Sequence, residues 1–227
     1  MKVLILAAGR GERMRPLTDH TPKPLLRAGG KSLVRHLIEA LVRADLRDLV
    51  LNQAYLGDQI VADLGDGRAL GARIIYSPEP EGALETGGGI LRALPLLGGD
   101  PFVVVNADIW TDYPFDRLPC HLAGLAHLVL VDNPVHHPAG DFILRQGRVI
   151  APPDSAADAA ARLTFSGIGV YRSALFKDCT QSRFPLAPVL RSAIGRGEVT
   201  GEHYEGRWRD IGTPERLAEL DRELSRC

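Results

Sequence analysis

Basic side chains and glycines share the loop that follows the first apolar run of the chain. The cations of this loop are Arg10, Arg13, Arg15 and Lys23, and its two glycines are Gly9 and Gly11. Because glycine has no Cβ, the backbone N–H groups of such a loop can approach an anion closely. Several cations in one loop suit a polyphosphate, which carries several negative charges. The loop therefore predicts a triphosphate-binding site.

An acidic side chain follows a later apolar run. Asp108 comes shortly after Phe102–Val105, whose composition indicates a buried strand. A carboxylate at the end of a strand can hold Mg²⁺, which takes one or two carboxylates together with phosphate oxygens and water. An isolated aspartate in this position more often stabilises a turn. For Asp108 taken alone, the turn is the favoured interpretation.

Two widespread nucleotide-binding motifs do not fit these residues. A dinucleotide fingerprint beginning at Gly9 would have Met14 in place of its third glycine, and the second predicted strand ends in Asn52, where an acid would hold a ribose. The segment 29–32, Gly-Gly-Lys-Ser, has Leu25 where a Walker A loop needs a glycine. Both a dinucleotide-dependent oxidoreductase and a Walker A protein are therefore disfavoured.

Strands and helices alternate in the first half of the chain. Short apolar runs predict strands at Val3–Leu6, Leu49–Leu51, Arg73–Tyr76 and Phe102–Val105, and helical periodicity predicts helices at Ser32–Ala44, Gln59–Leu64 and Gly89–Leu97. This alternation implies a parallel sheet with helices on both faces. In such sheets ligands bind beyond the carboxyl ends of the strands, where the glycine loop begins.

The second half of the chain follows a different pattern. Its predicted elements are a strand at Leu128–Val131, a hairpin of Phe142–Leu144 and Arg148–Ile150, a mobile loop at Pro152–Ala161, a strand at Phe165–Tyr171, and a helix at Pro214–Leu224 with Thr213 as N-cap. No internal repeat or linker divides the chain. We therefore expect an α/β fold with one domain, a mostly parallel central sheet with helices on both faces, and a small mixed insertion.

Charge and cysteine usage narrow the class of protein. The 227 residues include 27 Lys+Arg and 28 Asp+Glu, a formal net charge of −1, which argues against binding to nucleic acid or to a membrane surface. Three cysteines (Cys120, Cys179, Cys227) are widely spaced and contain no CxxC, as in reduced intracellular proteins. The first apolar run is too short for a signal peptide, and no stretch reaches the ~18–20 apolar residues of a membrane span. We expect a cytoplasmic protein.

Three longer runs carry a resemblance to a known family. They are L-A-A-G-x-G-x-R-M-x-P-L-T from Leu6, K-P-L from Lys23, and W-R-D-I-G-T-P-E from Trp208. They resemble the sugar-1-phosphate nucleotidyltransferases, which join a nucleoside triphosphate to a sugar phosphate and release pyrophosphate. The resemblance implies a single Rossmann-like nucleotidyltransferase domain over residues 1–227, with 1–108 binding the nucleotide and 109–227 binding the sugar and completing the metal site.

The same resemblance implies roles for individual residues. The nucleotide-binding residues would be Ala8, Gly9, Gly11, Glu12, Arg13, Lys23, Glu79 and Gly88, with Lys23 and Arg13 also catalytic. Asp108 and Asp210 would hold Mg²⁺, the expected cofactor. The sugar-binding residues would be Asn106, Gly140, Asp141, Ser166 and Gly167.

The loop from Ser77 to Gly89 is similar to the base-recognition loop of the family. A carboxylate of Glu79 or Glu81 would accept a hydrogen bond from a base edge that carries N–H, as in uracil, thymine or guanine. The alternative, with about equal weight, is that both glutamates are solvated while Thr86 caps a helix.

The substrate follows less directly from the residues. Many family members carry a Glu-Lys-Pro lysine on the sugar phosphate, but residues 152–156 contain no lysine, and Arg162 is a candidate replacement. The L-E-T-G-G-G and V-N-x-D-I-W-T-D-Y runs are most similar to members that use UTP and N-acetylmuramate 1-phosphate in cell-wall sugar recycling. The lactyl carboxylate of that sugar calls for a cation, for which Arg145, Arg162 and Arg172 are candidates.

Two alternative functions stay open. Members that transfer a guanylyl group to mannose 1-phosphate share most of these marks. A non-catalytic nucleotide- or sugar-binding regulatory protein on the same fold is expected to have lost Lys23, Asp108 or Asp210, and all three are present.

Overall fold

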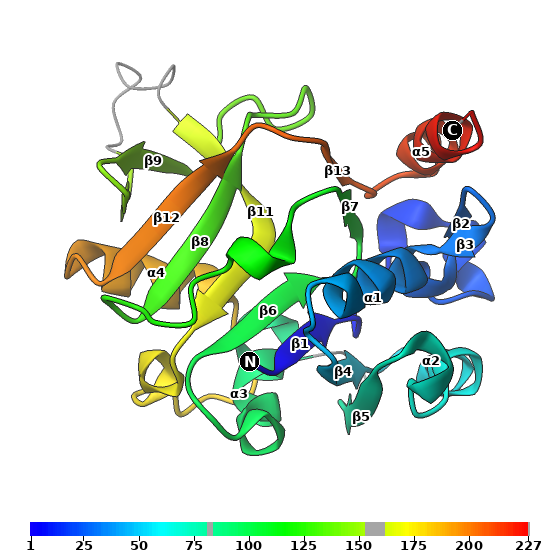
Figure 1. Ribbon diagram of the computed structural model, residues 1–227, viewed down its shortest axis with the longest axis horizontal. Coiled ribbons are helices and arrows are strands. Elements are labelled where there is room, and N and C mark those ends of the chain that lie inside the picture. Colours follow the sequence, from blue (N-terminus) through cyan, green and yellow to red (C-terminus); the bar gives the residue numbers. More distant parts are fainter. Residues whose placement is uncertain (81–83, 153–161, 227) are drawn as a thin grey trace.

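The computed structural model describes residues 1–80, 84–152 and 162–226, and these form one central sheet with helices packed on it (Figure 1). Nine of the described strands make up this sheet, in the order β5 (Arg73–Pro78), β4 (Asp48–Gln53), β1 (Val3–Leu6), β6 (Phe102–Asn106), β11 (Arg162–Tyr171), β8 (Ala126–Val131), β12 (Val199–Tyr204), β10 (Arg148–Ile150) and β9 (Phe142–Arg145).

The first four strands of this order are parallel to one another. In the register of the sheet, Leu6 at the end of β1 lies opposite Asn52 of β4 on one side and Asn106 of β6 on the other. The three carboxyl ends therefore meet at one edge of the sheet. Val3, Leu4 and Ile5 are fully buried because helices cover both faces here.

The prediction of a mostly parallel sheet is wrong, because the sheet is mixed. β11 runs antiparallel to both β6 and β8, and the β9–β10 hairpin is antiparallel, while β12 is parallel to β8. The physical reason lies in the connections. β11 comes after the β9–β10 hairpin in chain order and pairs antiparallel with β9 as well as with β6 and β8, so it does not need the crossover that parallel neighbours require.

Helices cover both faces of the sheet, as predicted. Helices α1 (Leu33–Arg43) and α2 (Gly57–Leu64) pack on one face, and α3 (Glu85–Leu97) and α4 (Leu186–Gly195) pack on the other. Figure 1 shows α3 and α4 on the same side of the sheet and α1 on the opposite side. Sequence periodicity did not predict α4. Among the described residues, no helix has the length and apolar composition needed to cross a membrane.

The last helix, α5 (Pro214–Leu224), packs away from the central sheet. It contacts a small ribbon of β2 (Arg27–Ala28) and β3 (Lys31–Ser32), which lies in the chain just after the glycine loop. The predicted cap is confirmed, since the side chain of Thr213 accepts a hydrogen bond from the backbone N–H of Arg216. Helix α5 therefore lies beside the segment that contains the predicted phosphate-binding residues (Figure 1).

A second ribbon joins the two halves of the chain. β7 (Ile109–Thr111) pairs antiparallel with β13 (Trp208–Asp210), so that Asp210 lies opposite Ile109. Tyrosines attach this ribbon to β12: Tyr113 donates a hydrogen bond to Glu202, and Tyr204 donates one to Asp112. Burial, followed by the hydrogen bond to Glu202, raises the pKa of Tyr113, which stays a neutral donor.

Two further predictions concern the region after β8. The β9–β10 hairpin is confirmed, and its turn residues Gln146 and Gly147 have φ values of 49° and 74°, as a tight hairpin turn requires. The predicted mobile loop at Pro152–Ala161 falls on residues that, apart from Pro152, lie outside the described ones.

Short 3₁₀ helices complete the described structure. Their bounds are Glu12–Met14, Leu17–Asp19, Lys23–Leu25, Arg68–Leu70, Phe115–Arg117 and Ser173–Phe176. The first three lie in the segment between β1 and β2, so the predicted phosphate-binding loop is a series of tight turns.

Candidate active site

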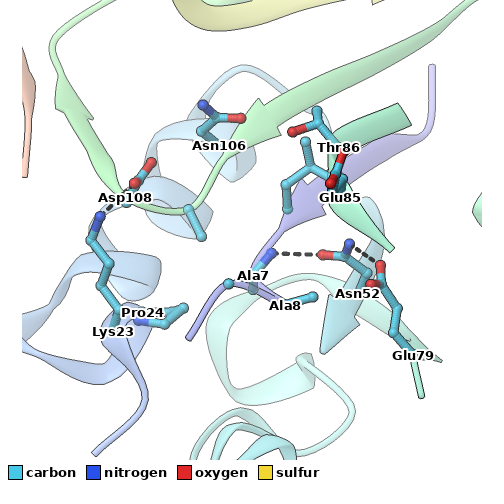
Figure 2. Close-up of a pocket in the computed structure, with 13 residues that line it drawn as sticks. Ala7, Ala8, Lys23, Pro24, Asn52, Glu79, Glu85, Thr86, Asn106 and Asp108 are labelled. Atoms are coloured by element: carbon cyan, nitrogen blue, oxygen red, sulfur yellow. Dashed lines mark hydrogen bonds and ion pairs between the residues drawn. The ribbon is translucent and has the colours of Figure 1, made fainter. Parts of the chain in front are cut away.

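A cleft of about 220 Å³ opens at the carboxyl ends of β1, β4 and β6. It is lined by Leu6, Ala7, Ala8, Gly9, Lys23, Pro24, Asn52, Glu79, Glu85, Thr86, Asn106, Ala107 and Asp108. Figure 2 shows a Lys23–Asp108 pair at one end of the cleft and an Asn52–Glu79 pair at the other. The predicted residues Ala8, Gly9, Lys23, Glu79, Asn106 and Asp108 are therefore brought together.

Lys23 is a buried cation at one end of the cleft. Its Nζ lies 2.5 Å from Oδ2 of Asp108, and the side chains of Lys23 and Asp108 are 10% and 34% exposed. Burial of an ammonium group is costly without a partner, and Asp108 supplies that partner. A ligand phosphate entering the cleft meets a positive charge already fixed in position.

At the other end of the cleft, Asn52 connects the loop after β1 to Glu79. Its Oδ1 accepts a hydrogen bond from the Ala7 N–H at 2.6 Å, and its Nδ2 donates to Oε1 of Glu79 at 2.6 Å. Oε2 of Glu79 accepts from the N–H of Leu84 at 2.8 Å. Each oxygen of Glu79 thus has one internal partner and further acceptor capacity. A Cβ on Gly89 would come within 2.6 Å of Oε1 of Glu79, so only glycine leaves room for this pair.

The first turn of α3 contributes Glu85 and Thr86 to the cleft. The interpretation of Thr86 as a helix cap is wrong, because α3 begins at Glu85 and its N-cap is Leu84, without a side-chain capping bond. Gly88 does not line this cleft: its N–H donates to the carbonyl of Phe184, and a Cβ there would lie 2.2 Å from the carbonyl oxygen of Ser182. The structure therefore packs Gly88 against the segment that precedes α4. Glu81, the other base-recognition candidate, lies outside the described residues.

The two glycines of the β1 loop have different surroundings. Gly9 lines the cleft, and a Cβ there would meet no atom within 4 Å. Gly11 has a φ of +70°, and a Cβ on it would lie 3.1 Å from Cβ of Lys23 and 3.1 Å from Cγ2 of Thr18. Gly11 therefore both permits the turn and lets Lys23 pass close to the backbone.

Three of the four cations in this loop have internal partners. Arg10 pairs with Glu12 at 2.6 Å, and Arg15 pairs with Asp19 at 2.7 Å. Glu12, a predicted nucleotide-binding residue, is thus an exposed ion-pair partner in the structure. Arg13 is exposed and has no hydrogen bond or ion pair with the described part of the chain. Its guanidinium is therefore available to an anion from solution.

Asp210 lies near Asp108 because β13 pairs with β7, the strand that follows Asp108. The N–H of Ile211 donates to the carbonyl of Asp108 at 2.9 Å, so the backbones of the two acids adjoin. Their side chains line neighbouring clefts, however. Asp210 lies in a second cleft of about 590 Å³, where its Oδ2 is 2.5 Å from Nη1 of Arg216 and 3.2 Å from Nε2 of His136.

The donor set fits a Mg²⁺ site that is completed by phosphates. Among the described residues, no group of three or more His, Cys, Asp and Glu side chains could hold a metal ion by itself. Mg²⁺ in nucleotide enzymes typically takes only one or two carboxylates and completes its octahedron with phosphate oxygens and water. Asp108 and Asp210 would be such a pair of carboxylates, and each of them is paired with a cation of the chain in the structure.

The predicted sugar-binding residues fall into two groups. Asn106 lines the cleft, and Gly167 lies behind it in a bulge of β11, where a Cβ would be 2.7 Å from Nδ2 of Asn106. The hydroxyl of Ser166 is buried and donates to the carbonyl of Val129 at 2.7 Å. Ser166 therefore shapes the bulge with its side chain.

Gly140 and Asp141 form the second group. Gly140 has a φ of 60° and lies against Asn133. The carboxylate of Asp141 accepts from the N–H of Phe165 at 2.8 Å and lies 3.0 Å from Nε2 of His137. This turn is thereby fixed to β11.

Of the three candidate cations for an acidic sugar, Arg145 and Arg162 lie on the neighbouring strands β9 and β11, whereas Arg172 lies beyond the far end of β11. Arg145 is exposed at the end of β9, beside the hairpin turn, and Arg172 donates to the carbonyl of Leu122 at 2.7 Å beyond the other end of β11. Of the three, Arg162 lies beside the turn at Gly140 and Asp141, with its Cβ 2.9 Å from the position of a Cβ on Gly140.

Sequence reasoning missed Asn52 as a site residue. It is 3% exposed and links the loop after β1 to Glu79. The available signal was its position, since a polar residue that ends a buried parallel strand next to β1 lies at the ligand-binding edge of the sheet.

A buried lysine, an acid after β6 and a glycine loop thus converge at the edge where α/β enzymes bind nucleotides. The sequence profile of the family described as nucleotidyl transferase matches residues 2–138. The chain belongs to this nucleotidyl transferase family, which confirms the resemblance found in the motifs.

Individual relatives agree with this membership. The chain is 50% identical to N-acetylmuramate alpha-1-phosphate uridylyltransferase of Neisseria meningitidis serogroup B, with 96% of each chain covered. It is 33% identical to the enzyme of the same name from Caulobacter vibrioides, over 93% of this chain and 92% of the relative. It is 29% identical to mannose-1-phosphate guanylyltransferase catalytic subunit beta of Xenopus tropicalis, over 94% of this chain and 62% of that one.

The fold also matches a solved structure. A putative glucose-1-phosphate thymidylyltransferase from Bacillus anthracis superimposes with a TM-score of 0.85 at 22% identity, covering 100% of this chain and 96% of that one. The prediction of a single α/β nucleotidyltransferase fold is confirmed to this extent.

Proposed function

We propose that the protein transfers the uridylyl group of UTP to an α-sugar 1-phosphate, giving a UDP-sugar and pyrophosphate. The proposed sugar substrate is N-acetylmuramate 1-phosphate, so that the reaction serves the recycling of cell-wall sugars in the cytoplasm. The observation that carries the proposal is the cleft with Lys23 and Asp108 at one end and Asn52 and Glu79 at the other. Its substrate assignment is supported by the 50% identical relative.

The phosphates of the nucleotide belong, in this proposal, at the glycine-loop end of the cleft. Backbone N–H groups at Gly9 and Gly11, together with Arg13, hold the β- and γ-phosphates. Lys23 neutralises the α-phosphate and the attacking sugar phosphate, two groups that otherwise repel each other. The attacking phosphate oxygen is already ionised, so no general base is needed. Alignment and charge neutralisation therefore account for the catalysis.

Asp108 and Asp210 are the residues that would hold Mg²⁺. The ion would supply further neutralisation of the phosphate charges when bound. The backbones of the two acids adjoin through the hydrogen bond from the N–H of Ile211 to the carbonyl of Asp108, which supports this assignment.

The base belongs at the Asn52–Glu79 end. The remaining acceptor capacity of Glu79 suits the ring N–H of a base edge, which uracil, thymine and guanine carry and adenine and cytosine lack. The sugar belongs beside Asn106 and the bulge at Gly167. Residues 1–108 would thus bind the nucleotide, with Asn106 at their end also contacting the sugar, and residues 109–227 would bind the rest of the sugar.

The experiment is a matrix of pyrophosphate-release assays in the presence of Mg²⁺. UTP, GTP, dTTP, CTP and ATP are each combined with several α-sugar 1-phosphates, including those of N-acetylmuramate and mannose. Release with UTP and the muramyl phosphate alone is the expected result. A preference for GTP and mannose 1-phosphate would move the protein to the guanylyltransferases. No release with any pair, from folded protein, would favour the regulatory function.

A further inference from the structure

Arg216 is held against the carboxylate of Asp210. Its Nη1 donates to Oδ2 of Asp210 at 2.5 Å and to the carbonyl oxygen of the same residue at 3.1 Å, and it lies 2.9 Å from Nε2 of His136. The side chains of Arg216 and Asp210 are only 19% and 22% exposed. An ion pair that is screened so little by water is stronger than one at the open surface.

Both acids that the proposed function assigns to the metal are thus paired with a basic side chain. Asp108 is paired with Lys23 and Asp210 with Arg216, both at 2.5 Å. A divalent cation that approaches either carboxylate is repelled by the cation already there. The chain therefore supplies counter-ions of its own to both acids.

The tip of Arg216 also lies close to Arg13. A Cβ on Gly212 would be 2.8 Å from Nη2 of Arg216 and 3.2 Å from Nη2 of Arg13. Both guanidinium tips therefore border the same small space above Gly212. Two like charges so close together repel each other unless an anion lies between them, and Arg13 has no partner in the described part of the chain.

We propose that Arg216 is an exchangeable counter-ion. It neutralises Asp210 until metal and nucleotide arrive, leaves this carboxylate to the metal, and joins Arg13 on a phosphate group of the substrate. The inference rests on the assignment of Asp210 to the metal in the proposed function. Its consequence is ordered assembly, in which the divalent cation binds well only together with a polyphosphate that draws Arg216 away.

The test measures metal binding separately from turnover. Mn²⁺ is titrated into nucleotide-free protein, and free Mn²⁺ is followed by electron paramagnetic resonance. For Arg216→Gln the dissociation constant for Mn²⁺ alone is expected to fall at least about fivefold, because the competing charge is gone. The affinity for pyrophosphate at saturating Mn²⁺ is expected to fall about tenfold, because one phosphate contact is lost.

The matched control is Arg222→Gln on the same helix, since Arg222 is exposed in the last turn of α5. It should leave both constants within about twofold of the wild type. If Arg216→Gln lowers the melting temperature, Arg216→Lys is measured as well. Lysine keeps the positive charge but lacks the planar guanidinium group. The dissociation constants for Mn²⁺ and pyrophosphate should therefore change in the same directions as in Arg216→Gln, but by less.

In Arg216→Gln the exchange predicts tighter binding of Mn²⁺ and weaker binding of pyrophosphate. A purely structural role of Arg216 predicts weaker binding of both ligands. Unchanged or weaker Mn²⁺ binding in folded Arg216→Gln overturns the inference. The proposed function fails separately. An active uridylyltransferase without the Mn²⁺ effect rejects only the counter-ion exchange, whereas the Mn²⁺ effect in a protein that makes no UDP-sugar rejects only the proposed reaction.

Discussion

Lys23 and Asp108 form an ion pair across 85 positions of sequence, with Nζ of Lys23 lying 2.5 Å from Oδ2 of Asp108. The pair joins the segment after the glycine loop to the carboxyl end of β6. It also fixes the ammonium group at the mouth of the cleft, where the reacting phosphates belong in the proposed function. A charge placed before the substrate arrives costs no reorganisation during the reaction.

The variant Lys23→Ala is therefore expected to lower kcat by about 100-fold or more, because it removes a preorganised charge from the reacting phosphates. Lys23→Arg should restore part of the activity, since it keeps the charge but not its position. Pyrophosphate release under saturating substrates measures both variants. A kcat close to that of the wild type in folded Lys23→Ala would remove Lys23 from the catalytic machinery.

Gly89→Ala tests the Asn52–Glu79 pair. The added methyl would lie 2.6 Å from Oε1 of Glu79 and 2.8 Å from Nδ2 of Asn52. We expect the free energy of unfolding to fall by about 1–3 kcal/mol through overpacking, and KM for UTP to rise. Gly99→Ala is the control, because a Cβ there meets no atom within 4 Å. If Gly89→Ala and Gly99→Ala had the same free energy of unfolding and the same KM for UTP, the Asn52–Glu79 pair would not depend on glycine at position 89.

Gly11→Ala separates backbone strain from the crowding of Lys23. Gly11 and Gly30 have φ values of +70° and +78°, so alanine at either position costs about 1–2 kcal/mol of stability. Only at Gly11 does the methyl approach Lys23, at 3.1 Å, whereas a Cβ at Gly30 meets open space. KM for UTP should therefore rise about tenfold in Gly11→Ala alone. The same rise in both variants would assign the effect to strain.

Stability should decrease in mild acid through His127. Burial lowers the pKa of its imidazole below the ordinary 6.5, an effect that Glu202 partly offsets. The unfolded chain then binds a proton more readily than the folded one, so the free energy of unfolding falls as pH drops from about 6.5 through the lower folded pKa. His127→Gln should lose less stability between about pH 7.5 and about pH 5.5 in urea unfolding.

The control for this comparison is His121→Gln, at an exposed position. That variant should lose as much stability as the wild type over the same pH range. If His127→Gln also follows the wild type, groups other than His127 cause the acid sensitivity.

Much of the first half of the fold and of the cleft could be predicted from the sequence. The strands ending near Leu6, Asn52 and Asn106 are continuous apolar runs, and buried parallel strands have this local signature. The motifs at Gly9 and Lys23 then predicted which residues line the phosphate-binding end of the cleft. Both signals lie within short stretches of chain.

The parts that were missed depend on partners far away in the chain. β12, with the sequence Val-Thr-Gly-Glu-His-Tyr, has no apolar run, and it becomes a strand by pairing with β8. The antiparallel entry of β11 beside β6 is equally non-local. The pairing of Asp210 with Arg216 is different, because Arg216 lies only six positions further along the chain. The motif identified Asp210, but it did not show that the turn between β13 and α5 brings the two side chains together.

The most direct test of the central claim follows the phosphorus of UTP. UTP labelled with radioactive phosphorus at the α or at the γ position is incubated with N-acetylmuramate α-1-phosphate, Mg²⁺ and the protein, and the products are separated. Uridylyl transfer predicts that the α label appears in a UDP-sugar and the γ label in pyrophosphate. Release of the γ label as inorganic phosphate, with no labelled UDP-sugar, would contradict the account.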